Sequence, residues 1–159
     1  MRIGLISDTH GLLRPEALAF LQGCDHIVHG GDIGDARILE TLAAIAPLTA
    51  VRGNNDIGPW AAELPETASI ELGGVRLFAL HDLAQWVLPA AGSADPAPAV
   101  VVSGHSHKPL AMQRGPVLCI NPGSAGPRRF SLPVSAAELL IENGELRHRI
   151  VELLPRAKG

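Results

Sequence analysis

Short apolar runs separated by turn-forming residues dominate the first half of the chain. Met1–Ser7 is apolar at successive positions and rich in Ile and Leu, and His26–His29 and Leu48–Val51 repeat this on a smaller scale. A run that is apolar on both faces of an extended chain is typical of a buried strand. We therefore predict three buried strands in this half.

Helical patterns lie between these strands. Pro15–Gln22 begins with proline, which suits the first turn of a helix. Ala36–Ala46 follows Asp35, a plausible N-cap, and places Ile38 and Leu42 on one face. A repeat of strand, loop and helix favours a parallel sheet covered by helices.

The second half of the chain has a different pattern. Two alternating runs, Ser69–Leu72 and Val75–Leu80, flank Gly73-Gly74 and predict a hairpin. We also predict a short helix over Leu83–Leu88 and a surface loop over Ala90–Pro98. Further strands are expected at Ala99–Ser103, Leu110–Arg114 and Val117–Asn121, with a second hairpin across Asn143-Gly144. The pattern predicts two packed sheets, one more parallel and one more antiparallel, with helices outside.

Composition narrows the class of protein. The chain has 159 residues, of which 47% are hydrophobic and 18% are charged. We therefore expect residues 1–159 to form one folded domain. A net charge of −3 argues against a broad surface for long nucleic acids. The sequence contains no apolar stretch of about 18 residues and starts directly with a strand, so we expect no membrane span and a cytoplasmic location.

Potential metal ligands follow the predicted strands. Asp8, Asp32, Asn54, His81 and His105 lie at or just beyond strand ends, the edge of an α/β sheet where ligands bind. His10 and His107 stand two residues after members of this set, and residues two apart on an extended segment point to the same side.

The donor types in this set define its chemistry. Carboxylate, amide and imidazole groups suit divalent transition metals. Seven donors exceed the needs of one tetrahedral zinc, which indicates two metal ions that share a ligand. Metal ions about 3.5–4 Å apart are a recurring solution for displacement at phosphorus.

Each candidate alone also has a structural interpretation. Asp8 and Asp32 could stabilise loops, His10 could be a surface residue, and Asn54 could form an Asx-turn. Asp56 could orient a metal ligand or only stabilise its turn. Arg128 and Arg129 could attract phosphate, fix their loop or form a subunit contact.

Five motifs in this order resemble one known family. They are Asp8-Thr9-His10, Gly31-Asp32, Gly53-Asn54-Asn55-Asp56, His81 and Gly104-His105-Ser106-His107. The pattern resembles the calcineurin-like metallophosphoesterases, above all the small single-domain bacterial and archaeal phosphodiesterases, which are related to the retromer scaffold subunit. The segment Ile120–Ser124 with Pro127-Arg128 is also typical of that subgroup. The resemblance implies an α/β fold, a four-layer α/β/β/α sandwich of two mixed sheets flanked by helices.

The resemblance also implies a division of the ligands. One metal would take Asp8, His10 and His107, the other would take Asn54, His81 and His105, and Asp32 would bridge them. The implied enzyme hydrolyses a small phosphodiester by attack of a hydroxide that bridges the two metal ions, with Asp32, Asn54 and His81 as the catalytic set. Mn²⁺ is the favoured ion, with Zn²⁺, Fe, Ni²⁺ and Co²⁺ as alternatives.

Two positions depart from the fuller family pattern. The family usually continues His-Gly-His where this chain has His81-Asp82-Leu83, and many relatives carry a histidine at the position of Asn55. Asn55 does not titrate, and the small single-domain relatives that also lack this histidine resemble phosphodiesterases more than broad phosphatases, which favours diesters over monoesters. The alternatives are a non-catalytic scaffold of the same fold, a phosphomonoesterase, or a nuclease for short substrates. A homo-oligomer is compatible with the sequence.

Overall fold

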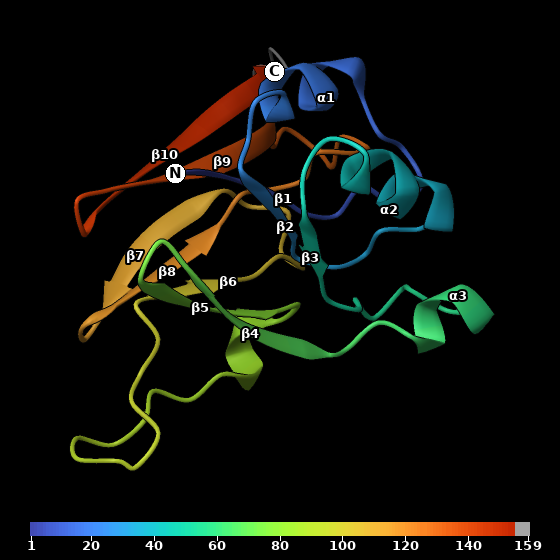
Figure 1. The fold of residues 1–159 in the computed structure, drawn as a ribbon. Coiled ribbons are helices and arrows are strands. Elements are labelled where there is room, and N and C mark those ends of the chain that lie inside the picture. The colour runs from blue at the N-terminus through green and yellow to red at the C-terminus, as the bar shows by residue number, and fades with distance from the viewer. Residues whose placement is uncertain (155–159) are drawn as a thin grey trace.

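Two five-stranded sheets stacked face to face form the body of the molecule in the computed structural model, which describes residues 1–154 (Figure 1). The first sheet has the order β10-β9-β1-β2-β3. Its parallel strands are β1 (Arg2–Ile6), β2 (His26–His29) and β3 (Leu48–Ala50). The antiparallel ribbon of β9 (Val134–Glu142) and β10 (Glu145–Leu154) adds to the free side of β1.

The second sheet has the order β4-β5-β6-β8-β7. Its central strands β5 (Val75–Leu80), β6 (Val100–Val102) and β8 (Val117–Asn121) are parallel, and β4 (Thr67–Leu72) and β7 (Leu110–Arg114) are antiparallel edges. The two mixed sheets of the sandwich are thus confirmed. The expected contrast between them is wrong, because each sheet has two parallel and two antiparallel neighbour pairs.

Helices cover the outer face of the first sheet. Helix α1 (Pro15–Leu21) and α2 (Ala36–Ala43) bury Leu21 and Leu42 against the outward side chains of β1 and β2. The Asp35 carboxylate accepts a hydrogen bond from the Arg37 backbone N–H, which confirms the predicted N-cap of α2. The four-residue helix α3 (Pro59–Ala62) was not predicted, because so short a helix has no apolar periodicity.

The outer face of the second sheet has a thinner cover. The predicted helix over Leu83–Leu88 is only the 3₁₀ turn η1 (Leu83–Gln85), and the segment 86–98 continues from it as the extended loop at the lower left of Figure 1. Trp86, Leu88 and Ala97 from this segment pack near Val101 and Val117. The helical layer on this side is therefore a single turn followed by a loop.

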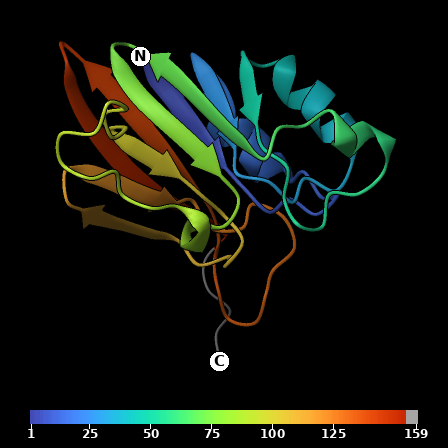
Figure 2. The same ribbon diagram turned by 90° about the horizontal axis from the view of Figure 1, so that it is seen from below.

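The strand registers bring the ends of the parallel strands to one edge. Ile6, His29 and Ala50 are neighbours across the first sheet, and Ala79, Val102 and Ile120 are neighbours across the second. The loops that follow these strand ends gather on one side of the molecule (Figure 2). No helix within residues 1–154 is long and apolar enough to cross a membrane.

Candidate metal centre

The structure brings all seven predicted ligands together at this edge. Each is supplied by a loop that follows β1, β2, β3, β5 or β6. The closest approaches link them in pairs: His10 Nε2 to His107 Nε2 at 3.2 Å, His81 Nε2 to Asp32 Oδ2 at 3.2 Å, His105 Nδ1 to Asn54 Oδ1 at 3.2 Å, and His107 Nε2 to Asp8 Oδ1 at 3.4 Å. Residues separated by up to about a hundred positions in the chain thus form one cluster.

Two overlapping groups have the spacing of metal ligands. Asp8, His10 and His107 form one group and Asp8, Asp32 and His81 the other, with the ligand atoms of each group within 4.8 Å of one another. The Oδ2 atom of Asp32 lies 3.2 Å from His81 Nε2 and 3.6 Å from His10 Nε2. Asp32 therefore faces both halves of the cluster, the position that a bridging carboxylate requires.

The cluster has a buried floor and an open rim. Asp8, Asp32, His81 and His107 are buried, whereas Asn54 and His105 are exposed. Three buried atoms of the floor have no hydrogen-bond partner: Asp8 Oδ1, His81 Nε2 and His107 Nδ1. Buried polar atoms rarely stay unpaired, because each costs free energy without a partner. Asp8 Oδ1 and His81 Nε2 both face the cluster, so these residues fit divalent cations.

The His81 ring is oriented for coordination. Its Nδ1 lies 2.7 Å from the Gly30 carbonyl oxygen, which can only accept, so Nδ1 carries the proton in the neutral ring. The lone pair of Nε2 then points towards Asp32. Burial lowers the pKa of His81, but the nearby Asp32 carboxylate and the Gly30 carbonyl oxygen outweigh it and raise the pKa overall. Such an anchored imidazole is the usual form of a histidine ligand.

Asp32 is held by Asn55, a role that the sequence did not reveal. The Asn55 backbone N–H donates to Asp32 Oδ1 at 2.8 Å, and its side-chain amide donates to Oδ2 at 3.1 Å. Burial raises the pKa of Asp32, but the neighbouring His81 imidazole and the hydrogen bonds from Asn55 hold it well below its usual range. Asn55 follows Asn54 in the chain, yet its partner is 23 residues away, so only the fold shows this contact.

Asp8 is also held by residues that sequence reasoning missed. Ser7 Oγ donates to Asp8 Oδ2 at 2.7 Å, and the His105 backbone N–H donates to the same oxygen at 3.1 Å. Ser124 Oγ donates to the Asp8 carbonyl oxygen at 3.0 Å. With Oδ2 engaged in this way, Oδ1 is the oxygen left to face the histidines.

A second network joins the first two ligand loops. The Gly31 N–H donates to His29 Nδ1, so the proton of the neutral ring is on Nε2, which lies 3.0 Å from Thr9 Oγ1. The Thr9 hydroxyl in turn donates to the Ile33 carbonyl oxygen. His29 is fully buried, and burial lowers its pKa to about 4. His29 is thus a buried core histidine with a partner at each ring nitrogen.

The remaining candidates stabilise loops. The Asp56 carboxylate accepts from the backbone N–H groups of Gly34 and Gly53, which ties the second ligand loop to the third. Arg128 donates to the Leu132 carbonyl oxygen within its own loop.

Burial lowers the pKa of His107, and the charge of Arg129 lowers it further.

The backbone is strained at the ligands themselves. Five of the seven adopt a left-handed φ: Asp8 at 55°, His10 at 43°, Asp32 at 58°, His105 at 72° and His107 at 62°. This region is unfavourable for residues other than glycine, and strain of this kind gathers at functional sites. Space is tight as well, because a Cβ atom at Gly53 would overlap Asp32.

A family model for the calcineurin-like phosphoesterase superfamily domain matches residues 1–144 of this chain. The chain belongs to this superfamily. A probable metallophosphoesterase of Methanothermobacter thermautotrophicus is 33% identical to this phosphoesterase over 95% of the chain and 92% of the relative. The phosphodiesterase YfcE of Escherichia coli K12 is 31% identical over 85% of both chains.

Solved structures show the same fold. The phosphoesterase superposes on YfcE with a TM-score of 0.66 and 24% identity, over 96% of this chain and all of YfcE. It superposes on Vps29 of Chaetomium thermophilum with a TM-score of 0.72 and 18% identity, over 99% of this chain and all of Vps29. At such identities these structures show the fold alone, so the chemistry of the site must be judged from the residues of this chain.

Proposed function

We propose that this phosphoesterase is a phosphodiesterase, with an EC 3.1.4-type activity, that uses two divalent metal ions held by Asp8, His10, Asp32, Asn54, His81, His105 and His107. The observation that carries the proposal is the convergence of these seven donors, with unpaired ligand atoms on Asp8 and His81. The phosphodiesterase relatives support the reaction class.

The side chains of the protein set the charge of the site and position the groups that would meet the phosphate. When bound, two cations would supply a water of lowered pKa and positive charge for the phosphate oxygens. Asp32 stays ionised because Asn55 and His81 hold its pKa low, and it faces both ligand groups. Asn54 and His105 lie at the exposed rim, where Asn54 can donate a hydrogen bond from its amide to a phosphate oxygen.

The phosphodiesterase relatives and the shape of the site favour diesters. Asn55 uses its side-chain amide to hold Asp32, and an amide does not titrate, so this position offers no general acid to the leaving group of either ester class. Two hollows also meet at Asp82 and His105, and a diester has two ester groups to place. The second hollow is polar, with a volume of about 370 Å³, and Arg52, Glu66 and Gln85 lie in its wall.

The test is hydrolysis of bis-p-nitrophenyl phosphate and p-nitrophenyl phosphate by metal-reconstituted protein. We expect the diester to be the better substrate, and Asp32→Asn to lower its kcat/KM by at least about a hundredfold. Asp95→Asn is the matched control, because Asp95 is exposed on the loop over the second sheet. A protein that cleaves only the monoester would contradict diester preference.

The same assay, run on the wild type, separates an enzyme from a non-catalytic scaffold. The superposition on Vps29 is the reason to keep a non-catalytic binding protein as the second candidate. Absence of turnover of either ester in the metal-loaded wild type, with metal binding intact by calorimetry, would favour the scaffold.

We propose Mn²⁺ as the best activator, as the resemblance to the small single-domain phosphodiesterases implies. The donor set alone, four imidazoles, two carboxylates and an amide, accepts any of the mid-row divalent ions. Apo protein titrated with Mn²⁺, Zn²⁺, Co²⁺, Ni²⁺ and Fe²⁺ should bind about two ions per chain. A stoichiometry of one would argue against the paired centre, and no activation by Mn²⁺ would exclude it as the favoured ion.

A further inference from the structure

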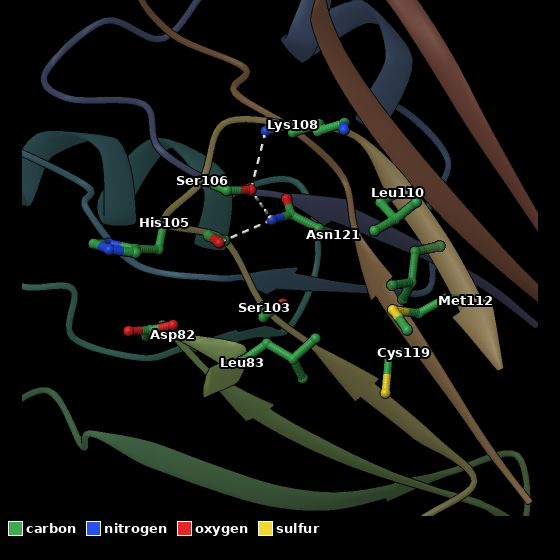
Figure 3. A pocket seen from close by; sticks show the side chains of 12 residues that line it. Asp82, Leu83, Ser103, His105, Ser106, Lys108, Leu110, Met112, Cys119 and Asn121 are labelled. Atoms are coloured by element: carbon green, nitrogen blue, oxygen red, sulfur yellow. Dashed lines mark hydrogen bonds between the residues drawn. The ribbon is translucent and has the colours of Figure 1, made fainter. Parts of the chain in front are cut away.

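An apolar hollow lies beside the metal centre on the outer face of the second sheet (Figure 3). Leu83 of η1 forms one side, Leu110 and Met112 of β7 form the other, and Cys119 of β8 lies in the floor. It is the part of this sheet face that the 86–98 segment leaves uncovered. Leu110 and Met112 are 46% and 38% exposed, although both are large apolar side chains.

The hollow is continuous with the metal centre. Asp82 and His105 line both this hollow and the polar one on the other side. In Figure 3 the His105 imidazole points away from Leu110 and Met112 and lies at the margin of the hollow. A phosphate held at His105 would therefore have one ester group within reach of these apolar side chains.

Two polar side chains of the wall, Ser106 and Asn121, are paired within the protein. The Asn121 amide donates to the Gly104 carbonyl oxygen at 2.8 Å and to Ser106 Oγ at 3.1 Å, and its oxygen accepts from the Gly123 N–H. Burial raises the pKa of the Cys119 thiol, so this sulfur is neutral and soft. Asp82 and Lys108 also line the hollow, and the apolar and sulfur surface that it offers to a ligand comes from Leu83, Leu110, Met112 and Cys119.

The volume limits what can enter. The hollow measures about 210 Å³. A cavity of about 150 Å³ accepts benzene, and drug-sized ligands need about 300 Å³ or more. The hollow therefore has room for an aromatic ring, and its open side leaves space for a larger group to extend into solvent.

We infer that this hollow is a subsite for one ester group of the substrate and that it favours an aromatic ring or a branched alkyl group over a small or polar group. This inference rests on the proposed phosphodiesterase function and specifies its substrate class. The ring would lie between Leu83 on one side and Met112 on the other, with the phosphate at the metal centre. Sulfur–aromatic contact with Met112 would add to the burial of the ring.

Competitive inhibition by two phosphonates isolates this subsite from leaving-group chemistry. Phenylphosphonate and methylphosphonate share the metal-binding head and differ only in the organic group. With bis-p-nitrophenyl phosphate as reporter, we expect the phenyl compound to bind about tenfold more tightly, or better. Met112→Gln should reduce that ratio about three- to tenfold, because glutamine has nearly the same length but a polar end. Leu110→Gln, on the same exposed edge strand, is the second variant.

Val87→Asn is the matched control. Val87 is an apolar residue, 81% exposed, that is not part of this hollow. Its replacement should therefore leave the ratio of the two phosphonate inhibition constants unchanged. Equal inhibition by both phosphonates, or an unchanged ratio in Met112→Gln and Leu110→Gln, would overturn the subsite.

A binding experiment separates this inference from the catalytic proposal. The chain has only two methionines, Met1 and Met112, so protein labelled with [ε-¹³C]methionine gives one signal from the hollow and one internal reference. Phenylphosphonate should shift the Met112 methyl signal and leave Met1 unchanged, while methylphosphonate moves neither by a comparable amount. This result would stand even if no diester were hydrolysed. If neither phosphonate shifts Met112 although both displace each other from the metal-loaded protein, the hollow is not a substrate subsite, and a partner's side chain becomes its alternative occupant.

Discussion

Asn55 shows at the level of one residue how the site differs from what its motif suggests. The family pattern draws attention to this position as a candidate acid, and the structure gives it a different part, a twofold donor to Asp32. A residue that holds the carboxylate proposed to bridge the metal ions should act on metal affinity and on the rate together.

We expect Asn55→Ala to lower kcat/KM for bis-p-nitrophenyl phosphate about ten- to a hundredfold and to weaken binding of the second metal ion, because the Asp32 carboxylate loses one of its two donors from Asn55. Steady-state kinetics and metal titration would measure this. Gln113→Ala, which removes an exposed amide on β7, should change neither quantity. A loss of rate at saturating metal with unchanged metal affinity would speak against a ligand-holding role.

His29 makes stability depend on pH. Its pKa is about 4 in the folded protein against 6.5 when exposed, so between these values the unfolded chain binds a proton that the folded protein does not. Stability is therefore complete above about pH 6.5 and is lost as pH falls towards 4, by about 3 kcal/mol in total.

Denaturant unfolding of apo wild type and His29→Gln from pH 7.5 to 4.5 tests this. The variant should be less stable at pH 7.5, because its contacts with Thr9 and Gly31 change, but its stability should fall less steeply with acid. Parallel curves for the two proteins would show that His29 does not carry this dependence.

Turns and strand ends determine the site at the level of elements. Gly144 and Gly53 illustrate two different needs for glycine. Gly144 follows Asn143 in the β9–β10 turn with φ 78°, and no atom lies within 4 Å of the place that an alanine methyl would take there. Gly53 has no such room, because Asp32 lies against it.

Alanine at the two glycines should separate stability from activity. Gly144→Ala should cost about 1 kcal/mol of folding free energy through its left-handed backbone and leave diesterase activity intact. Gly53→Ala should lower activity at least tenfold, because the new methyl displaces Asp32. Urea unfolding and kcat/KM on the same samples distinguish the two, and equal effects on activity would contradict the assignment.

The sequence was most informative about the elements that its local pattern controls. The strands before each ligand, the Asp35 cap and both glycine-containing hairpins were predictable, since each depends on a few neighbouring residues. The equal share of parallel and antiparallel pairs in the two sheets was not predictable from the local pattern, because the pairing of β9 with β1 joins residues more than a hundred positions apart. The hydrogen bonds from Asn55 to Asp32 and from Gly34 to Asp56 were missed, because each joins residues more than twenty positions apart.

For the whole molecule, metal binding should be coupled to folding. Asp8, Asp32, His81 and His107 come from loops of both sheets, so an ion that binds them links the two halves of the sandwich. At a free metal concentration a hundred times Kd, stability should rise by about 2.7 kcal/mol per site. A thermal melt with and without Mn²⁺ measures this shift. The shift should shrink in Asp32→Asn and persist in Asp95→Asn.

Because five of the candidate ligands have a left-handed backbone, replacing one of them with glycine can stabilise the fold while it removes a group that the proposed catalysis needs. Because His105 is exposed and held at φ 72°, His105→Gly relieves the backbone and uncovers little apolar surface. We expect the metal-free variant to be more stable than wild type by about 1 kcal/mol, while its metal affinity falls. If selection for turnover relaxed, substitutions at such positions would be favoured because they raise the stability of the fold. A catalytic ancestor could in this way give rise to descendants that keep the sandwich and lose the chemistry.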